Sequence, residues 1–326
     1  MDFVTGATGC IGNVLVRTLL EKGREVKVLV RETSDLSAIE GLDVERAVGD
    51  ILDIDSLVEA FRGADIVYHL AGVVTIMPGD RKLIRRSNHK GTVNVINACL
   101  KCGVRRLVYA SSIHALKESP TGTVIDESMP FDIKCRRGEY DRSKAAASLE
   151  VIKAASNGLD SVVVCPTGVI GPYDFKGSFS TRTFIDFARG RMKITTGGAY
   201  DFVDVRDVAD GLVMASEKGR KGQFYILSGE RITMDELMGM LSENSGVKPP
   251  GYKIPVWLAG AAGIISPLYY WLARKTPRFT YYTIDTLRSN SYISYKKARR
   301  ELGYNPRPIK KTVEDTFKWM RQNKIL

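Results

Sequence analysis

The sequence predicts an α/β fold in which a doubly wound parallel sheet carries helices on both faces, with a smaller, mostly helical C-terminal part. Three observations support this prediction. Apolar, strand-like runs alternate with helical stripes through the first half of the chain, a glycine-rich turn joins the first strand to the first helix, and glycines follow the predicted helices. Such alternation is typical of parallel sheets with right-handed crossovers. At 326 residues, the chain is long enough for a large core.

The expected elements follow one another in a regular order as far as Pro166. Strands are expected at 3–5, 25–30, 44–48, 66–70, 106–111 and 161–165, and helices at 11–22, 54–62, 83–102 and 140–157. The glycines where a helix C-cap is expected are Gly23, Gly63, Gly103 and Gly158. Beyond Pro166 the alternation loosens, and helices are expected at 178–189, 205–216, 234–245, 256–273, 294–302 and 312–323.

Composition limits the class of protein. The net charge is +11, but the cations are spread along the chain without an aromatic-interleaved stripe, so we expect a solvated surface and no nucleic-acid partner. The five cysteines are too scattered for a disulfide framework, and Cys99-x-x-Cys102 has no second pair or histidine cluster that would complete a metal site. No metal is therefore expected. Because the first strand starts at residue 3, we expect no signal peptide and a cytoplasmic location.

One apolar segment, 255–273, carries no charge until Arg274. It is shorter than the roughly 20 residues that span a bilayer, and Pro267 interrupts it. The favoured interpretation is a helix that packs on the core or lines an apolar pocket. The alternative is a peripheral membrane contact through 255–275, with tryptophans and basic residues at the interface.

The segment from Thr5 to Gly12, Thr-Gly-Ala-Thr-Gly-Cys-Ile-Gly, joins the first predicted strand to the first predicted helix. Three glycines here allow a tight turn and present bare N–H groups and a helix N-terminus to a pyrophosphate. Their spacing is Gly-x-x-Gly-x-x-Gly instead of the commoner Gly-x-Gly-x-x-Gly. Alone, the segment is equally compatible with an ordinary strand-to-helix turn.

Tyr140 and Lys144 are four residues apart at the start of a predicted helix. Residues at i and i+4 share a helix face, so the phenol and the ammonium group can enter one site. A nearby cation is expected to lower the pKa of the tyrosine, which could then exchange a proton with a carbonyl or hydroxyl group. Such pairs are also common on solvated helices. The position of this pair after the glycine-rich turn favours a functional role.

In this order, the motifs resemble extended short-chain dehydrogenases/reductases of the NAD-dependent epimerase/dehydratase superfamily, which includes nucleotide-sugar epimerases, dihydroflavonol reductases and 3β-hydroxysteroid dehydrogenases. The resemblance runs nearly end to end, as far as Leu-Gly-Tyr-Asn-Pro at 302–306. It implies a Rossmann-like nucleotide-binding domain over 1–170, to which 200–228 return, and a substrate-binding lobe made of 171–199 and 229–326. It also implies a homodimer that pairs through the helices at 83–102 and 140–157.

The resemblance implies a catalytic group of Ser112, Tyr140 and Lys144, with Asn88 beside it. Tyr140 would transfer the proton, Lys144 would lower its pKa and hold the ribose, and Ser112 would polarise the substrate carbonyl. Ser111 is the alternative serine, one position away. Asn88 would hold backbone and water near the lysine, although an asparagine in a helix could equally face solvent.

The three histidines are expected in different surroundings. His69 lies within a predicted strand and is expected to be a buried, hydrogen-bonded imidazole. His89 is expected at the surface. His114 closely follows the catalytic serine and is expected to touch the substrate.

Arg31 ends the second predicted strand, where an acidic residue would bind the 2′-hydroxyl of NAD and an arginine suits the 2′-phosphate of NADP. We therefore predict NADP as the cofactor, with NAD as the alternative. A solvated arginine is the other interpretation. The resemblance places the remaining cofactor contacts at strand ends, where small residues are also good turn formers: Gly6, Thr8, Gly9, Cys10, Ile11, Gly12, Asp50, Ile51, Leu70, Ala71, Gly72, Tyr140, Lys144, Pro166, Thr167, Gly168 and Val169.

Two departures from the nucleotide-sugar enzymes bear on the substrate. Thr167 stands where those enzymes usually carry asparagine, and Tyr200 stands where they usually carry an arginine that pairs with a diphosphate. The predicted function is therefore an NADP-dependent oxidoreductase that interconverts a secondary alcohol and a ketone on a largely apolar molecule, such as a steroid, flavonoid or isoprenoid. The alternatives are a nucleotide-sugar 4-epimerase or dehydratase with the same triad, and an NADP-sensing protein without catalytic activity.

Overall fold

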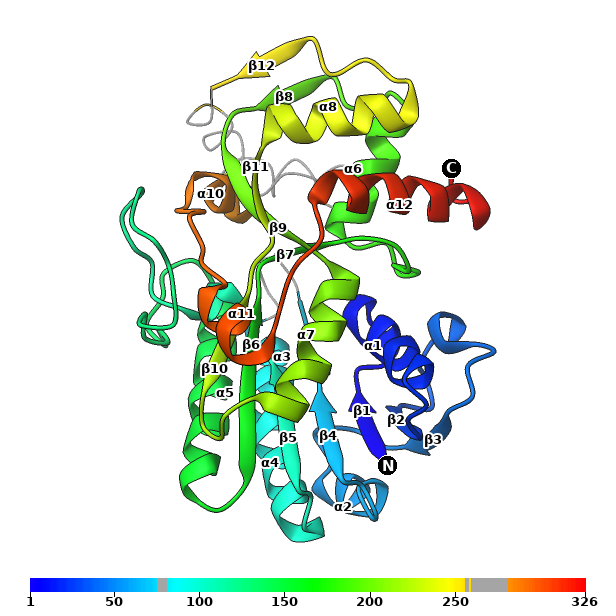
Figure 1. Cartoon of the computed structure of the whole chain (residues 1–326), viewed down its shortest axis with the longest axis vertical. Coiled ribbons are helices and arrows are strands. Elements are labelled where there is room, and N and C mark those ends of the chain that lie inside the picture. The colour runs from blue at the N-terminus through cyan, green and yellow to red at the C-terminus, as the bar shows by residue number, and fades with distance from the viewer. Residues whose placement is uncertain (75–80, 256–257, 259–280) are drawn as a thin grey trace.

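The computed structural model describes residues 1–74, 81–255, 258 and 281–326. A parallel sheet of seven strands forms its centre, in the order β10-β6-β5-β4-β1-β2-β3 (Figure 1). Strand order reverses at β1, which lies between β2 and β4, and a doubly wound sheet opens a crevice at such a point. The strands are β1 (Asp2–Thr5), β2 (Val26–Val30), β3 (Glu45–Val48), β4 (Ile66–His69), β5 (Arg106–Ala110), β6 (Asp160–Pro166) and β10 (Phe224–Leu227).

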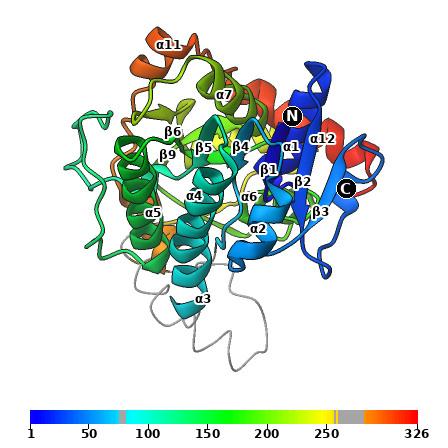
Figure 2. The ribbon, with the colours of Figure 1, turned by 90° about the horizontal axis from the view of Figure 1, so that it is seen from below.

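Helices cover both faces of this sheet (Figure 2). One face carries α1 (Cys10–Glu21) and α7 (Val205–Lys218), and the other carries α2 (Ile54–Ala60), α4 (Gly91–Cys102) and α5 (Glu139–Ser156). Successive strand residues point to opposite faces. Val4 therefore joins the core under α1 and α7, whereas its neighbour Phe3 joins the core under α2, α4 and α5. These findings confirm the predicted fold class.

Local sequence sets where several helices begin and end. Asp53 and Asp204 cap α2 and α7 by accepting backbone N–H bonds, as expected of short acidic side chains at N-caps. The four glycines predicted to follow helices all have positive φ, where a side chain would be strained: Gly23, Gly63, Gly103 and Gly158. The helix expected at 83–102 is divided into α3 (Arg81–Arg85), a π-helical turn η2 (Arg86–Lys90) and α4.

The second part of the chain builds on a smaller, three-stranded sheet in the order β11-β9-β7, and a two-stranded sheet, β12-β8, lies above it in Figure 1. The elements of this part are β7 (Gly168–Ile170), α6 (Phe179–Ala188), β8 (Ile194–Thr196), β9 (Ala199–Asp204), β11 (Glu230–Thr233), α8 (Met234–Ser245), β12 (Tyr252–Ile254), α10 (Tyr281–Arg288), α11 (Lys296–Leu302) and α12 (Ile309–Gln322). A third apolar core joins β7, α6, β9, β11, α8 and α12.

The two parts are interleaved in sequence. Leu302 of α11 and the following Tyr304 pack in the core of the seven-stranded sheet, although the predicted division assigns 229–326 to the substrate lobe. The predicted domain boundaries at 170, 200 and 228 remain a prediction.

The predicted homodimer would pair through the helices at 83–102 and 140–157. Leu100 of α4 and Leu149 of α5 are exposed on these helices. The pairing of two copies remains a prediction.

The apolar segment at 255–273, with its predicted helix and membrane contact, lies outside the described residues apart from Pro255 and Leu258. Within the described ranges, none of the helices has the length and apolar character needed to cross a bilayer. The five cysteines carry free thiols. The described residues also hold no cluster of three or more histidine, cysteine or acidic side chains placed to bind a metal ion.

Candidate active site

The opening glycines allow two close backbone approaches. Gly6 has a φ of +78°, and a Cβ there would lie 2.6 Å from the backbone nitrogen of Ala71, in the turn after β4. A Cβ on Gly12 would lie 2.1 Å from the carbonyl oxygen of Gly6. Helix α1 starts after Gly9, which supplies no side-chain cap, so its first N–H groups are left to another partner. This cradle fits a pyrophosphate group at a helix N-terminus.

A basic side chain from the second part of the chain lies over this turn. The Nζ atom of Lys176 donates a hydrogen bond of 2.9 Å to Thr8 Oγ1. Hydrogen bonds from Ser37 lower the pKa of Asp35, in the loop after β2, and the positive charge of Lys176 adds to this effect. Lys176 therefore lies where a cation could meet cofactor phosphates. It was not identified from the sequence, because 168 residues separate it from Thr8.

The turns after β2 and β3 hold the next predicted residues. Arg31 is exposed at the end of β2, and its backbone N–H bonds Ser34 Oγ at 3.0 Å. One carboxylate oxygen of Asp50 accepts a bond from the backbone N–H of Leu52 at 2.9 Å. Ile51 is held by α4, whose Asn94 side chain donates to the Ile51 carbonyl at 2.9 Å.

Asn88 fixes the turn after β4. Its side-chain oxygen accepts from the backbone N–H of Val73 at 2.7 Å, and its side-chain nitrogen donates to the Val73 carbonyl at 3.0 Å. The same nitrogen donates to Ser143 Oγ at 3.1 Å, and Ser143 bonds the Tyr140 carbonyl at 2.8 Å. Asn88 is buried within the π-helical turn and thus links the strand-end turn to α5, which excludes the solvent-facing alternative.

Ser112, Tyr140 and Lys144 lie together at the carboxyl end of β5. Ser112 lies close enough to Tyr140 to oppose the rise that burial causes in the pKa of the phenol. Lys144 is buried, donates to the Ala110 carbonyl at 2.7 Å, and lies 3.7 Å from the point where a Cβ on Gly72 would stand. Ser111, the alternative serine, instead shares a buried 2.7 Å hydrogen bond with Ser148 on α5. The geometry therefore selects Ser112 as the serine beside Tyr140.

The pKa of Tyr140 differs from the sequence-based expectation. Burial raises this pKa to about 12, and the hydrogen bond from Ser112 opposes that rise. Burial also lowers the pKa of Lys144 to about 8. Both side chains are buried, and burial disfavours the charged form of each. Without bound cofactor, this effect on the pKa of Tyr140 outweighs the stabilisation of the phenolate that we expected from the ammonium group of Lys144.

The histidines occupy three distinct environments. His69 is fully buried and bonds Thr5 Oγ1 at 2.7 Å and Thr92 Oγ1 at 3.1 Å, as expected of a structural imidazole. His89 is partly exposed. His114, in the turn η3 (Ile113–Ala115) directly after Ser112, bonds Tyr200 Oη at 2.7 Å.

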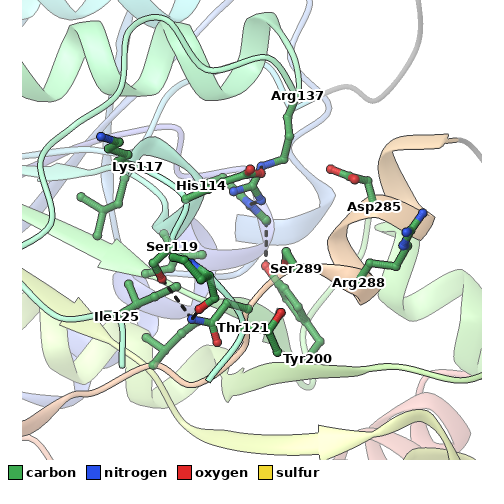
Figure 3. A pocket seen from close by; sticks show the side chains of 16 residues that line it. His114, Lys117, Ser119, Thr121, Ile125, Arg137, Tyr200, Asp285, Arg288 and Ser289 are labelled. Atoms are coloured by element: carbon green, nitrogen blue, oxygen red, sulfur yellow. Dashed lines mark hydrogen bonds and ion pairs between the residues drawn. The ribbon is translucent and has the colours of Figure 1, made fainter. Parts of the chain in front are cut away.

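A cavity of about 380 Å³ opens beside His114 and Tyr200 (Figure 3). This volume lies in the usual range for a small-molecule site. The segment 255–273, which we predicted to line an apolar pocket, lies outside the described residues apart from Pro255 and Leu258. Many of the described residues that line this cavity are polar, among them Lys117, Ser119, Arg137, Arg288 and Asn290.

A doubly wound sheet with a glycine-rich turn at its crevice is the arrangement typical of enzymes that bind a nicotinamide dinucleotide. The chain belongs to the NAD dependent epimerase/dehydratase family, whose model matches residues 3–227. It is an NAD(P)-dependent enzyme of the extended short-chain dehydrogenase/reductase type, which confirms the resemblance seen in the sequence.

Related proteins extend this match over the whole chain. Sterol demethylase protein B of Methylococcus capsulatus is 38% identical over 99% of both chains. The 3beta-hydroxysteroid-dehydrogenase/decarboxylase isoform 1 of Arabidopsis thaliana is 29% identical, covering 88% of this chain and 70% of the relative. The crystal structure of gox2253 superposes with a TM-score of 0.87 at 35% identity, covering 99% of this chain and 98% of the other.

Proposed function

We propose that the protein is an NADP-dependent oxidoreductase that interconverts a secondary alcohol and a ketone on a largely apolar small molecule. The observation that carries this proposal is the convergence of Ser112, Tyr140 and Lys144 next to the glycine-rich cradle. When bound, the nicotinamide supplies or accepts the hydride. In reduction, Ser112 Oγ donates to the carbonyl oxygen and Tyr140 Oη gives up the proton. The charge of Lys144 stabilises the phenolate left on Tyr140.

Two observations support a substrate of the steroid, flavonoid or isoprenoid kind. The names of two relatives refer to sterols or steroids. In addition, Tyr200 lies in the wall of the cavity, and a neutral phenol cannot match an arginine in pairing with the diphosphate of a nucleotide sugar.

A substrate panel tests the proposal. Purified protein is incubated with NADPH and polycyclic ketones, and in parallel with UDP-, GDP- and dTDP-sugars. Sustained consumption of NADPH with a ketone is the expected result. Conversion of a sugar nucleotide without net consumption of cofactor would instead identify an epimerase or dehydratase, and binding of NADPH without any turnover would identify a sensing protein.

Replacing Arg31 with aspartate is expected to shift cofactor preference from NADPH to NADH. Arginine attracts the 2′-phosphate, whereas a carboxylate repels it and accepts a bond from the 2′-hydroxyl. The measurement is the ratio of kcat/KM for the two cofactors, which should move at least about tenfold if one charge-assisted bond is exchanged. Lys101→Asp, an exposed change of the same charge on α4, serves as the control. An unchanged ratio in Arg31→Asp would remove the argument for NADP.

The pH profile of ketone reduction is expected to fall as pH rises through about 8. Below this value Lys144 keeps its positive charge, and above it the ammonium group loses its proton, because burial lowers its pKa to about 8. The pKa of Tyr140 is about 12, so the phenol keeps its proton throughout this range. The residual activity of Lys144→Arg should lack this fall, since arginine stays protonated. A wild-type kcat/KM that stays level from pH 7 to 10 would contradict the role given to the charged form of Lys144.

A further inference from the structure

Three side chains from separate segments form a hydrogen-bond chain beside the catalytic group (Figure 3). Arg137, in the loop before α5, places Nη1 3.1 Å from Nδ1 of His114. The other ring nitrogen of His114, Nε2, lies 2.7 Å from Oη of Tyr200 on β9. The rings of His114 and Tyr200 are also nearly parallel, with an interplanar angle of 12°.

The direction of each bond follows from the donors available. A guanidinium group only donates, so Nδ1 of His114 is the acceptor from Arg137. Burial, assisted by the charge of Arg137, lowers the pKa of His114 to about 3, so the imidazole is neutral and carries its one proton on Nε2. Nε2 therefore donates to Tyr200 Oη. Tyr200 accepts this bond and keeps its own hydroxyl proton to donate elsewhere.

Tyr200 packs against the start of β7, where Gly168 is one of the predicted cofactor contacts. A Cβ on Gly168 would lie 2.5 Å from Cε1 of Tyr200, so the tyrosine ring packs directly on the backbone there. Tyr200 is also close enough to Tyr140 for a charge on one to affect the other. It lines the cavity, and within the ranges that the structure describes no acceptor receives its hydroxyl proton.

We propose that Tyr200 is a specificity-determining residue that donates a hydrogen bond to a second oxygen of the substrate, close to the reacting carbon. His114 and Arg137 are positioning residues that orient this donor. The inference rests on the proposed oxidoreductase function and narrows its substrate class to oxygenated apolar compounds, such as hydroxy ketones, diketones and diols. Arg137 also pairs with Glu118, which offsets its charge, so the Tyr200 donor suits a neutral oxygen more than an anion.

Paired bicyclic ketones test this inference. 1-hydroxy-2-decalone and 4-hydroxy-2-decalone carry a hydroxyl near the carbonyl, and 2-decalone lacks it. Dissociation constants are measured by calorimetry on the complex of the full chain with NADP⁺, and kcat/KM is measured with NADPH. We expect the wild-type affinity and kcat/KM for at least one hydroxylated ketone to exceed those for 2-decalone by about 10-fold or more. This is the size of effect that one buried hydrogen bond between protein and substrate produces.

Tyr200→Phe keeps the ring that packs on Gly168 and removes only the donor. This variant should lose the preference for the hydroxylated ketones over 2-decalone, because the ring remains and only the donor is missing. His114→Phe should weaken the same preference by freeing the Tyr200 hydroxyl to rotate, and it keeps the inference testable if Tyr200→Phe does not fold. Tyr252→Phe, at an exposed tyrosine on β12, is the matched control.

The outcomes separate this inference from the proposed function. The role of Tyr200 would be overturned if Tyr200→Phe lost affinity and kcat/KM equally for all three ketones. It would also be overturned if the variant kept the wild-type preference for the hydroxylated ketones. Wild-type protein that binds none of the ketones, or binds them all equally, would overturn it as well. Wild-type protein that binds a hydroxylated ketone preferentially without turning it over would support the role of Tyr200 and reject the oxidoreductase function.

Discussion

Tyr140→Phe is expected to lower kcat for ketone reduction by about 10²- to 10⁴-fold, the usual contribution of a positioned acid. The substitution removes the phenol hydroxyl beside Ser112 and keeps the ring on α5. The pKa of Tyr140 is about 12, so the wild-type phenol is protonated and ready to donate at neutral pH. Single-turnover rates of NADPH oxidation measure the effect directly.

Binding of NADPH should survive this change, because the cradle of Gly6 and Gly12 is separate from the phenol. Fluorescence titration of NADPH checks this expectation, and Tyr252→Phe again provides an exposed control. If Tyr140→Phe turned over ketones at the wild-type rate, the proton would have to come from another group, and the mechanism proposed for Ser112, Tyr140 and Lys144 would be wrong.

Gly12→Ala is expected to weaken binding of NADPH by about 10- to 100-fold, which corresponds to an overpacking cost of about 1–3 kcal/mol. The added Cβ would lie 2.1 Å from the Gly6 carbonyl oxygen, so either the glycine-rich turn or the start of α1 must move. Calorimetric titration of NADPH measures the loss, and thermal unfolding shows how much of the cost falls on stability.

Gly239→Ala is the matched control, because Gly239 also lies in a helix but has no atom within 4 Å of the position of its Cβ. That variant should bind NADPH normally and unfold at the same or a higher temperature, since alanine favours helix over glycine. Equal affinity for NADPH in Gly12→Ala and wild type would show that the turn is not the phosphate cradle.

Periodicity predicted much of the fold because it reports on burial within each element. Strands 3–5, 25–30 and 44–48 and the first helix all match observed elements to within one residue or so at each end. The π-helical turn at Arg86–Lys90 could not be predicted in this way. It depends on the bonds that draw Asn88 to Val73 and Ser143, which lie in other parts of the chain.

The candidate site shows the same limit. Tyr140 and Lys144 are near in sequence, so helical spacing alone places them on one face. The pairs of Tyr200 with His114 and of Lys176 with Thr8 join residues 86 and 168 positions apart, and no local pattern links them. The direction of the pKa shift of Tyr140 could not be predicted from the sequence either. It depends on how completely the tertiary structure buries the phenol.

The placement of β10 has a consequence for synthesis of the chain. Phe224–Leu227 pairs with β6 but leaves the ribosome long after it, and α7, which covers the same core as α1, also arrives late. Until then, the nascent chain presents an unpaired sheet edge and an uncovered apolar surface, both of which invite aggregation. We therefore expect the growing polypeptide to need chaperones up to this point, and fragments that stop near residue 170 to aggregate instead of folding as free nucleotide-binding units.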